Sequence, residues 1–118
     1  MNELESGSVV LVDFTFSNHQ QSKMRPALVV SNSENNRQSR DVVVMKITSK
    51  EPRQWGVPVA NEDLVMGSLD YRSFVQVDGI YSLDKTIIRE VIGTLSQEKM
   101  HEIHVQIAAL FGLNSIAP

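Results

Sequence analysis

The sequence has no cysteine among its 118 residues. Disulfide frameworks, thiolate nucleophiles, iron–sulfur clusters and cysteine-ligated zinc are therefore excluded. Long apolar runs are missing too, and none approaches the roughly 18 residues that a membrane-spanning helix needs. The first residues, MNELESG, are acidic where a secretion signal is basic. We expect a single cytoplasmic domain over residues 1–118, with no membrane association.

The common catalytic and metal-binding motifs are also missing. The sequence contains no phosphate-binding glycine loop, no His-Glu-x-x-His, no nucleophile elbow and no calcium loop. His101 and His104 are spaced to share a metal on a helix, but no third ligand is evident. A packed or surface histidine is the favoured interpretation of both. We expect neither a metal nor any other cofactor.

Charge is unevenly distributed along the chain. The net charge is −3, yet residues 23–53 contain seven Lys or Arg against three Asp or Glu, a local net charge of +4. Such a segment can form a positive surface for an anionic ligand. Seven ordinary solvated side chains are an equally open interpretation.

The pattern of apolar residues predicts several strands followed by one helix. Short β-branched runs predict strands over residues 9–14, 26–31, 41–48, 56–59 and 73–77. Asp78-Gly79 predicts a turn, with an extension of the last strand over 80–83 beyond it. A helical turn is expected after Asp84, where this residue serves as an N-cap.

The C-terminal part changes to helical periodicity. Apolar residues recur at a spacing of three or four from Met100 onward, Ser96 suits the N-cap, and Gly112 suits the C-terminal stop. Strands without intervening helices favour an antiparallel sheet. The predicted fold class is α+β: a small, mostly antiparallel, barrel-like sheet with a C-terminal helix.

Two polar residues occupy informative places at strand ends. Arg25 directly precedes Pro26, which restrains it toward extended geometry. Thr48 ends the third strand and is followed by Ser49 and Lys50. A guanidinium and hydroxyls that leave neighbouring strand ends can converge on a phosphate. From the residues alone, a surface ion pair for Arg25 and an ordinary strand position for Thr48 stay open.

Several segments resemble one known family in order and spacing. They are GSVVLVDF (7–14), RPALVVSN (25–32), DVVVMKITSK (41–50) and SFVQVDGIYSLDKTIIREVIGTLS (73–96). Together they resemble the MazF/PemK toxins over about residues 7–112. The resemblance implies a barrel-like sheet, a homodimer, and a bacterial toxin with a cognate antitoxin. It further implies metal-independent endoribonuclease activity on single-stranded RNA, with the family's catalytic positions at Arg25 and Thr48.

The mechanism that these residues can support is transesterification. The 2′-hydroxyl of RNA attacks the adjacent phosphorus to give a 2′,3′-cyclic phosphate, while Arg25 and Thr48 stabilise the phosphorane charge. His19 is the titratable candidate for proton transfer, since arginine is a poor base near neutrality. The predicted substrate-binding residues are Phe16, His19, Gln20, Gln21, Asn32, Ser49 and Lys50.

Alternatives remain at this level. A non-catalytic toxin of the same architecture, like the gyrase-directed CcdB, would bind a protein target such as DNA gyrase, and Arg25 and Thr48 would then be incidental. A catalytically inactive module is a third interpretation. For Phe16, simple core packing competes with base contact, and Trp55 could either stack on a base or fill the barrel.

Overall fold

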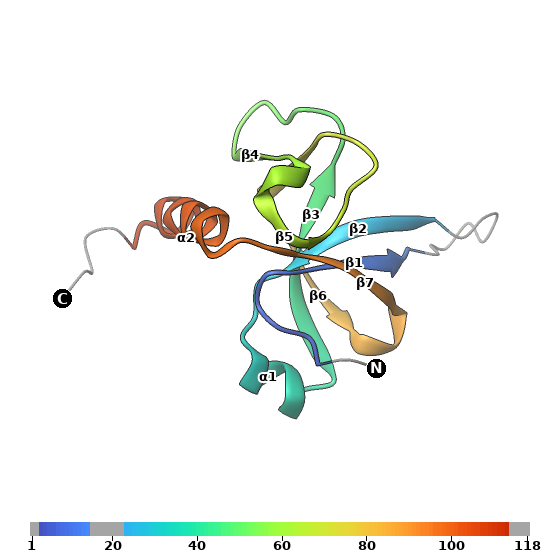
Figure 1. The fold of residues 1–118 in the computed structure, drawn as a ribbon. Coiled ribbons are helices and arrows are strands. Elements are labelled where there is room, and N and C mark those ends of the chain that lie inside the picture. Colours follow the sequence, from blue (N-terminus) through green and yellow to red (C-terminus); the bar gives the residue numbers. More distant parts are fainter. Residues whose placement is uncertain (1–2, 15–22, 114–118) are drawn as a thin grey trace.

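The computed structural model describes residues 3–14 and 23–113 as one strongly curled antiparallel sheet with helices at its margins (Figure 1). The strand order is β4-β6-β3-β2-β1-β7-β5. The strands are β1 (Ser8–Asp13), β2 (Met24–Val29), β3 (Asp41–Thr48), β4 (Gly56–Val59), β5 (Leu64–Gly67), β6 (Ser73–Asp84) and β7 (Ile88–Leu95). The helices are α1 (Ser33–Gln38) and α2 (Gln97–Phe111), with 3-10 turns η1 (Asn61–Asp63) and η2 (Lys85–Ile87).

The predicted fold class is confirmed. All six strand pairs of this sheet are antiparallel, and a C-terminal helix follows the last strand. The strands expected over 41–48 and 56–59 have those bounds, whereas β2 begins two residues earlier than expected, at Met24. The sequence did not predict α1, β5 or β7, because α1 has no apolar residue and the apolar residues of β5 and β7 show no clear period.

The turn expected at Asp78-Gly79 is wrong, because β6 runs without a break through both residues. The register of β6 against β3 shifts in this region, between Met45 and Ile47 of β3. A bulge therefore absorbs the extra residues and bends the strand. A Cβ built on Gly79 would lie 3.2 Å from the Lys46 Cβ, so the bulge brings the two backbones close together.

The central strands are buried on both faces. Successive residues of β1, β2 and β3 point to opposite faces of the sheet, so alternate residues belong to two different apolar clusters. One cluster lies toward α2 and includes Val9, Leu28, Met45, Ile47, Val75 and Ile103. The other includes Leu4, Val10, Val12, Ala27, Val29, Val44 and Ile88. Because a slip of one residue would exchange the two sets, burial on both sides specifies the register strongly.

Helix α2 begins and ends as the sequence predicts. The Ser96 hydroxyl accepts a hydrogen bond from the Lys99 N–H at 3.1 Å, and Gly112 ends the helix with a φ of 70°. Met100 and Ile103 are buried against the sheet, but Phe111 is 59% exposed. The C-terminal turns of α2 extend beyond the sheet, toward one side of the molecule (Figure 1).

A buried amide joins α1 to the N-terminal segment. The Asn36 Nδ2 donates to the carbonyl oxygens of Leu4 (3.0 Å) and Ser31 (2.8 Å), and its Oδ1 accepts from the Ser31 hydroxyl at 2.6 Å. The same hydroxyl accepts from the Val43 N–H at 2.9 Å. Only 3% of Asn36 is exposed, so water cannot replace these partners.

We therefore expect Asn36→Ala to destabilise the protein by about 1–3 kcal/mol, because it leaves two buried carbonyls without a donor. The free energy of unfolding, measured by urea denaturation, tests this prediction. Gln38→Ala, at an exposed position of the same helix, is the matched control. Equal midpoints for the two variants would contradict this account of α1.

Candidate functional site

The start of β2 and the end of β3 meet at one end of the sheet. Their ladder pairs Leu28 with Met45 and Ala27 with Lys46. The ladder ends at this last pair, and Arg25 and Thr48 each lie two residues beyond it, at the start of β2 and the end of β3. Both then lie on the face that carries Ala27, since residues two apart on a strand share a face. The structure thus brings two residues that are 23 positions apart in the sequence to one end and one face of the sheet.

Thr48 is half-buried, and its hydroxyl already has one partner. The Oγ1 accepts a hydrogen bond from the Lys50 N–H at 3.2 Å, which closes a small turn directly after the strand. A hydroxyl that accepts in this way still has its own hydrogen to donate. Ser49 and Lys50 are exposed beside it, so the end of β3 presents a hydroxyl donor and a cation together.

Arg25 is exposed at the edge of the same face. It lies opposite Val12 in the ladder between β1 and β2. Within the residues that the structure describes, no carboxylate oxygen lies within 4.0 Å of Arg25. The surface ion pair that the sequence left open is therefore not formed with any described residue.

Six of the seven described cations without an ion pair gather around this end of the sheet, and the seventh, Lys85, lies in η2. In residues 3–14 and 23–113, four Lys or Arg form ion pairs: Arg37, Arg40, Arg89 and Lys99. Six others belong to the start of β2, the end of β3 and the segments next to it: Lys23, Arg25, Lys46, Lys50, Arg53 and Arg72. The segments that hold these six cations also contain three carboxylates, Glu51, Asp70 and Asp78. The net charge of the segments is therefore +3.

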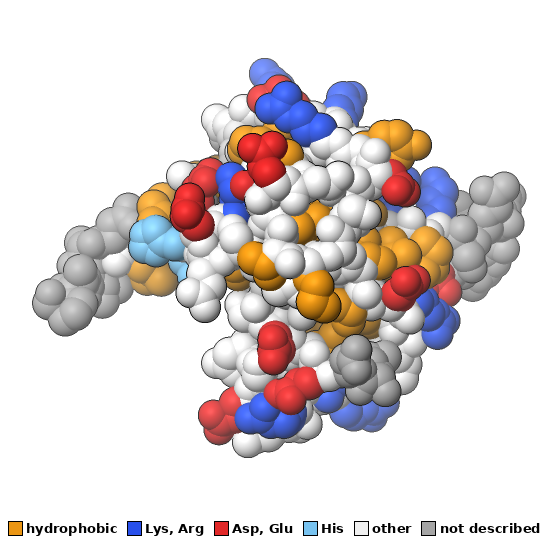
Figure 2. Space-filling model, viewed as in Figure 1, with side chains coloured by type: hydrophobic (Ala, Val, Ile, Leu, Met, Phe, Trp, Pro, Cys, Tyr) orange, Lys and Arg blue, Asp and Glu red, His pale blue; other side chains and the backbone are white. Residues whose placement is uncertain are grey.

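The space-filling view shows Lys and Arg side chains at this end of the molecule. These blue side chains stand along the upper edge, over the segment between β3 and β4, with red carboxylates beside them (Figure 2). The lower end contains α1, where Arg37 pairs with Glu3. Positive charge that is not neutralised within the protein can bind an external anion. This observation favours the anion-binding interpretation of residues 23–53 over solvated side chains.

Asn32 does not join this group. It lies beyond the other end of β2, seven residues from Arg25, and it is the N-cap of α1. Its Oδ1 accepts a hydrogen bond from the Asn35 N–H at 2.8 Å. We therefore leave Asn32 out of the candidate site, since its amide serves the helix cap. Phe16, His19, Gln20 and Gln21 lie outside the described residues, and their substrate contacts stay predictions.

Trp55 packs against the core cluster that faces α2 and is half-buried. This supports the packing alternative for its ring. Its φ of 62° lies in the left-handed region, which a bulky residue adopts only where its surroundings hold it. The Val77 N–H donates to the Trp55 carbonyl oxygen at 2.9 Å and helps to hold this conformation.

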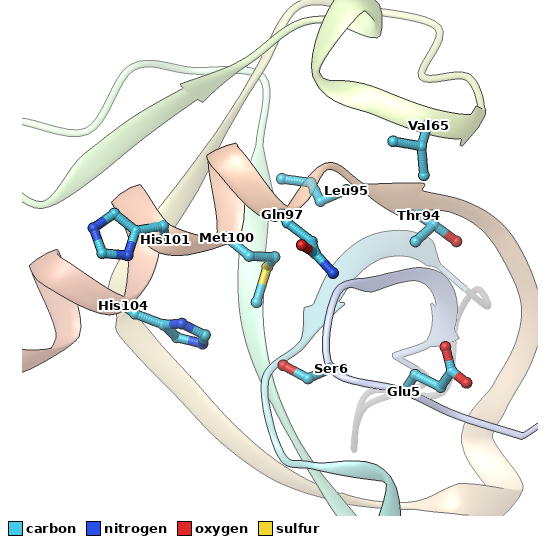
Figure 3. A pocket seen from close by; sticks show the side chains of 9 residues that line it. All are labelled: Glu5, Ser6, Val65, Thr94, Leu95, Gln97, Met100, His101 and His104. Carbon is cyan, nitrogen blue, oxygen red and sulfur yellow. The ribbon is translucent and has the colours of Figure 1, made fainter.

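A cavity of about 650 Å³ lies away from Arg25 and Thr48 (Figure 3). Its lining is shared by the N-terminal segment, β5, β7 and the first turns of α2: Glu5, Ser6, Val65, Thr94, Leu95, Gln97, Met100, His101 and His104. His101 and His104 are exposed, which agrees with their interpretation as surface histidines. Among the described residues, no group of three His, Asp or Glu side chains is placed to hold a metal ion.

The described part of the chain contains no helix that is both long enough and apolar enough to cross a membrane.

The candidate site is an open, positively charged end of a curled sheet rather than a closed pocket. An open surface of this kind accommodates a long anionic polymer better than a small molecule. Sequence reasoning missed one feature of it, an Arg72–Phe74 pair, because only strand pairing sets Phe74 opposite Thr48.

Solved structures share the fold. A MazE–MazF complex from Deinococcus radiodurans superimposes with a TM-score of 0.78, 21% identity and coverage of 96% of this chain and 100% of that chain. An endoribonuclease in complex with its cognate antitoxin, from a mycobacterial species, gives a TM-score of 0.75 with 26% identity and coverage of 96% and 97%. The architecture is therefore that of the MazF-type toxins.

Sequence comparison is more specific. The endoribonuclease MazF of Staphylococcus saprophyticus is 29% identical over 115 residues, which cover 96% of this chain and 95% of the relative. A family model described as the PemK-like, MazF-like toxin of type II toxin–antitoxin systems matches residues 5–111. The chain belongs to this toxin family, as the ordered motifs of its sequence predict.

Proposed function

We propose that this toxin is an endoribonuclease that cuts single-stranded RNA in the bacterial cytoplasm and that a cognate antitoxin inhibits it. The observation that supports the proposal is that Arg25 at the start of β2 and Thr48 at the end of β3 lie on one face at one end of the sheet, among unpaired cations. The staphylococcal and mycobacterial relatives, both named endoribonucleases, support it. An antitoxin segment that covers the same positive surface would exclude RNA from it.

The chemistry that fits these residues is transesterification. The RNA 2′-oxygen forms a bond to the adjacent phosphorus, and the bond from phosphorus to the 5′-oxygen breaks. The 2′-hydroxyl loses its proton and the departing 5′-oxygen gains one, so the products are a 2′,3′-cyclic phosphate and a 5′-hydroxyl. This reaction needs neither a protein nucleophile nor a metal ion. DNA is not a substrate, because it lacks the attacking hydroxyl.

Arg25 and Thr48 stabilise the charge that grows on the non-bridging oxygens. The guanidinium offers a planar fork of donors to two of these oxygens. The Thr48 hydroxyl, held by the Lys50 N–H, donates its own hydrogen to the same group. Donors that are already in place when charge develops contribute strongly to catalysis. Ser49 and Lys50 provide further contacts to the chain of phosphates.

Arg25→Ala and Thr48→Val are each expected to lower the rate of RNA cleavage roughly 10²–10³-fold, the usual effect of losing one such donor. The measurement is the appearance of fragments that end in a cyclic phosphate, from a long single-stranded RNA in the presence of EDTA. Thr48→Ser keeps the hydroxyl and should retain most of the activity. Lys85→Ala, which removes a half-buried cation of η2 outside the segments around Thr48, is the control.

Cleavage that is equal in the parent and in Arg25→Ala would overturn the catalytic assignment. RNA that stays intact with the parent protein, together with inhibited DNA supercoiling, would instead support the protein-binding alternative.

His19 remains the candidate for proton transfer. A histidine accepts a proton only in its neutral form, so the rate of cleavage should rise with pH to a plateau. His19→Ala should remove this rise and lower the rate about 10²–10⁴-fold. The measurement is the rate of cleavage of an oligoribonucleotide between pH 5 and 9. A profile identical to that of the parent would exclude His19 from the reaction.

We further propose that the toxin is a homodimer. Val65 beside the cavity, and Val105 and Phe111 on α2, are 69%, 48% and 59% exposed. On a helix, Val105 and Phe111 lie near the side of His101 and His104, so these apolar side chains form one surface with the cavity. A second copy of the chain would remove this surface from water, and large exposed apolar patches commonly mark such interfaces.

Val105→Glu combined with Phe111→Glu should shift the protein from a dimer to its 13.2 kDa protomer, because two buried charges oppose association. Light scattering after size-exclusion chromatography measures the mass. Gln38→Glu on α1 is the control for added charge. A doubly substituted protein that still has the dimer mass would refute this interface.

A further inference from the structure

Arg72 and Phe74 form a pair on the face that carries Thr48. The Arg72 guanidinium carbon lies 5.7 Å from the centroid of the Phe74 ring, within the range of a cation–π contact. Phe74 lies directly opposite Thr48 in the ladder between β6 and β3, and opposite Pro58 in the ladder between β6 and β4. Arg72 shares the face of Phe74, since the two residues are two apart.

The pair lies beside Thr48, because Phe74 is the ladder partner of Thr48. Opposite residues of an antiparallel ladder have Cβ atoms about 4.5–5.5 Å apart, so the Phe74 ring starts next to the Thr48 hydroxyl. Arg72 lies above this ring. Across the sheet, Thr48 is followed by Phe74 and then by Pro58, and the Arg72 guanidinium covers the Phe74 ring. A second guanidinium therefore lies one side chain away from Thr48, and only Arg25 is assigned to the scissile phosphate.

The environment of Arg72 favours a phosphate as its ligand. Phe74 is only 9% exposed, and Arg72 covers its ring, so the ring is not open for a base to stack on. Arg72 itself is exposed, and no described carboxylate lies within 4.0 Å of it. The ring fixes one face of the guanidinium and leaves its edge donors available. A planar fork with free donors matches two oxygens of a phosphate.

We propose that Arg72 binds the phosphate of a nucleotide that flanks the cleavage site, and that Phe74 positions it for this contact. The inference rests on the proposed function and adds a second anion contact to that site. Arg72 strengthens RNA binding and touches none of the reacting atoms. It should therefore determine KM, whereas kcat depends on Arg25 and Thr48.

Binding of a single-stranded oligodeoxynucleotide, which the toxin cannot cleave, tests the proposal as a function of salt. Arg72→Ala should weaken binding roughly tenfold, the value of one charge-assisted hydrogen bond. It should also reduce the slope of log K against log salt by about 0.7, the contribution of one phosphate contact to single strands. With RNA, KM should rise and kcat should stay at the parent value.

Two further variants separate charge from positioning. Arg72→Lys should keep the salt slope but lose part of the affinity, because an ammonium group lacks the fork. Phe74→Leu should keep the slope and weaken binding by releasing Arg72 from the ring. Far-ultraviolet circular dichroism and the urea midpoint check that each variant folds. Lys85→Ala removes a cation of η2 instead, and this variant should bind as the parent protein does.

The inference would be overturned if the parent protein cuts RNA and folded Arg72→Ala binds with the affinity and salt slope of the parent. That result would leave the proposed function intact. A fall in kcat with unchanged KM would also overturn it, since Arg72 would then act on the reaction itself. Failure of the proposed function is a different result, namely RNA that the parent protein leaves uncut.

Discussion

The pairing register of β2 against β3 is the constraint on which the candidate site depends. It is specified by burial on both faces, since Ala27 and Leu28 face opposite apolar clusters and a slip would exchange them. The same register brings the start of β2, with Arg25, and the end of β3, with Thr48, to one end of the sheet. The apolar core therefore aligns the polar residues, although none of its members touches a substrate.

The distribution of ion pairs separates structural cations from those available to a ligand. Arg37 and Arg40 pair with Glu3 and Asp84 at the end that contains α1. The Asp84 carboxylate also accepts the N–H of Thr86, and this hydrogen bond holds the pKa of Asp84 below its ordinary value. The cations around Thr48 lack such partners in the described part of the chain. A protein with a net charge of −3 thus keeps a group of cations that its own carboxylates do not neutralise.

The two proposed surfaces of the toxin use different physical forces. The end with Arg25 and Arg72 offers charge and donors on an exposed sheet, which suits a flexible polyanion and a salt-dependent affinity. The surface of the cavity and α2 offers apolar side chains, which suit a second copy of the same chain. Because the two surfaces do not share residues, substitutions on one can be interpreted without the other.

Much of the fold could be predicted from local patterns. The strand over 41–48, the Ser96 cap and the Gly112 stop depend on neighbouring residues, and the structure has them as expected. The bulge at Asp78-Gly79 could not be predicted, because it arises where β6 must follow β3 past a register shift. The strands β5 and β7 likewise owe their existence to pairing partners.

The sequence by itself determined the family and the limits of the C-terminal helix, and it proposed Arg25 and Thr48, because motifs and capping signals are local. Only the tertiary structure decided which residues lie beside them. It placed Asn32 as the cap of α1 at the far end of β2, and it set the Arg72–Phe74 pair next to Thr48. The reason is physical: neighbours across a sheet are chosen by long-range pairing, which no short stretch of sequence encodes.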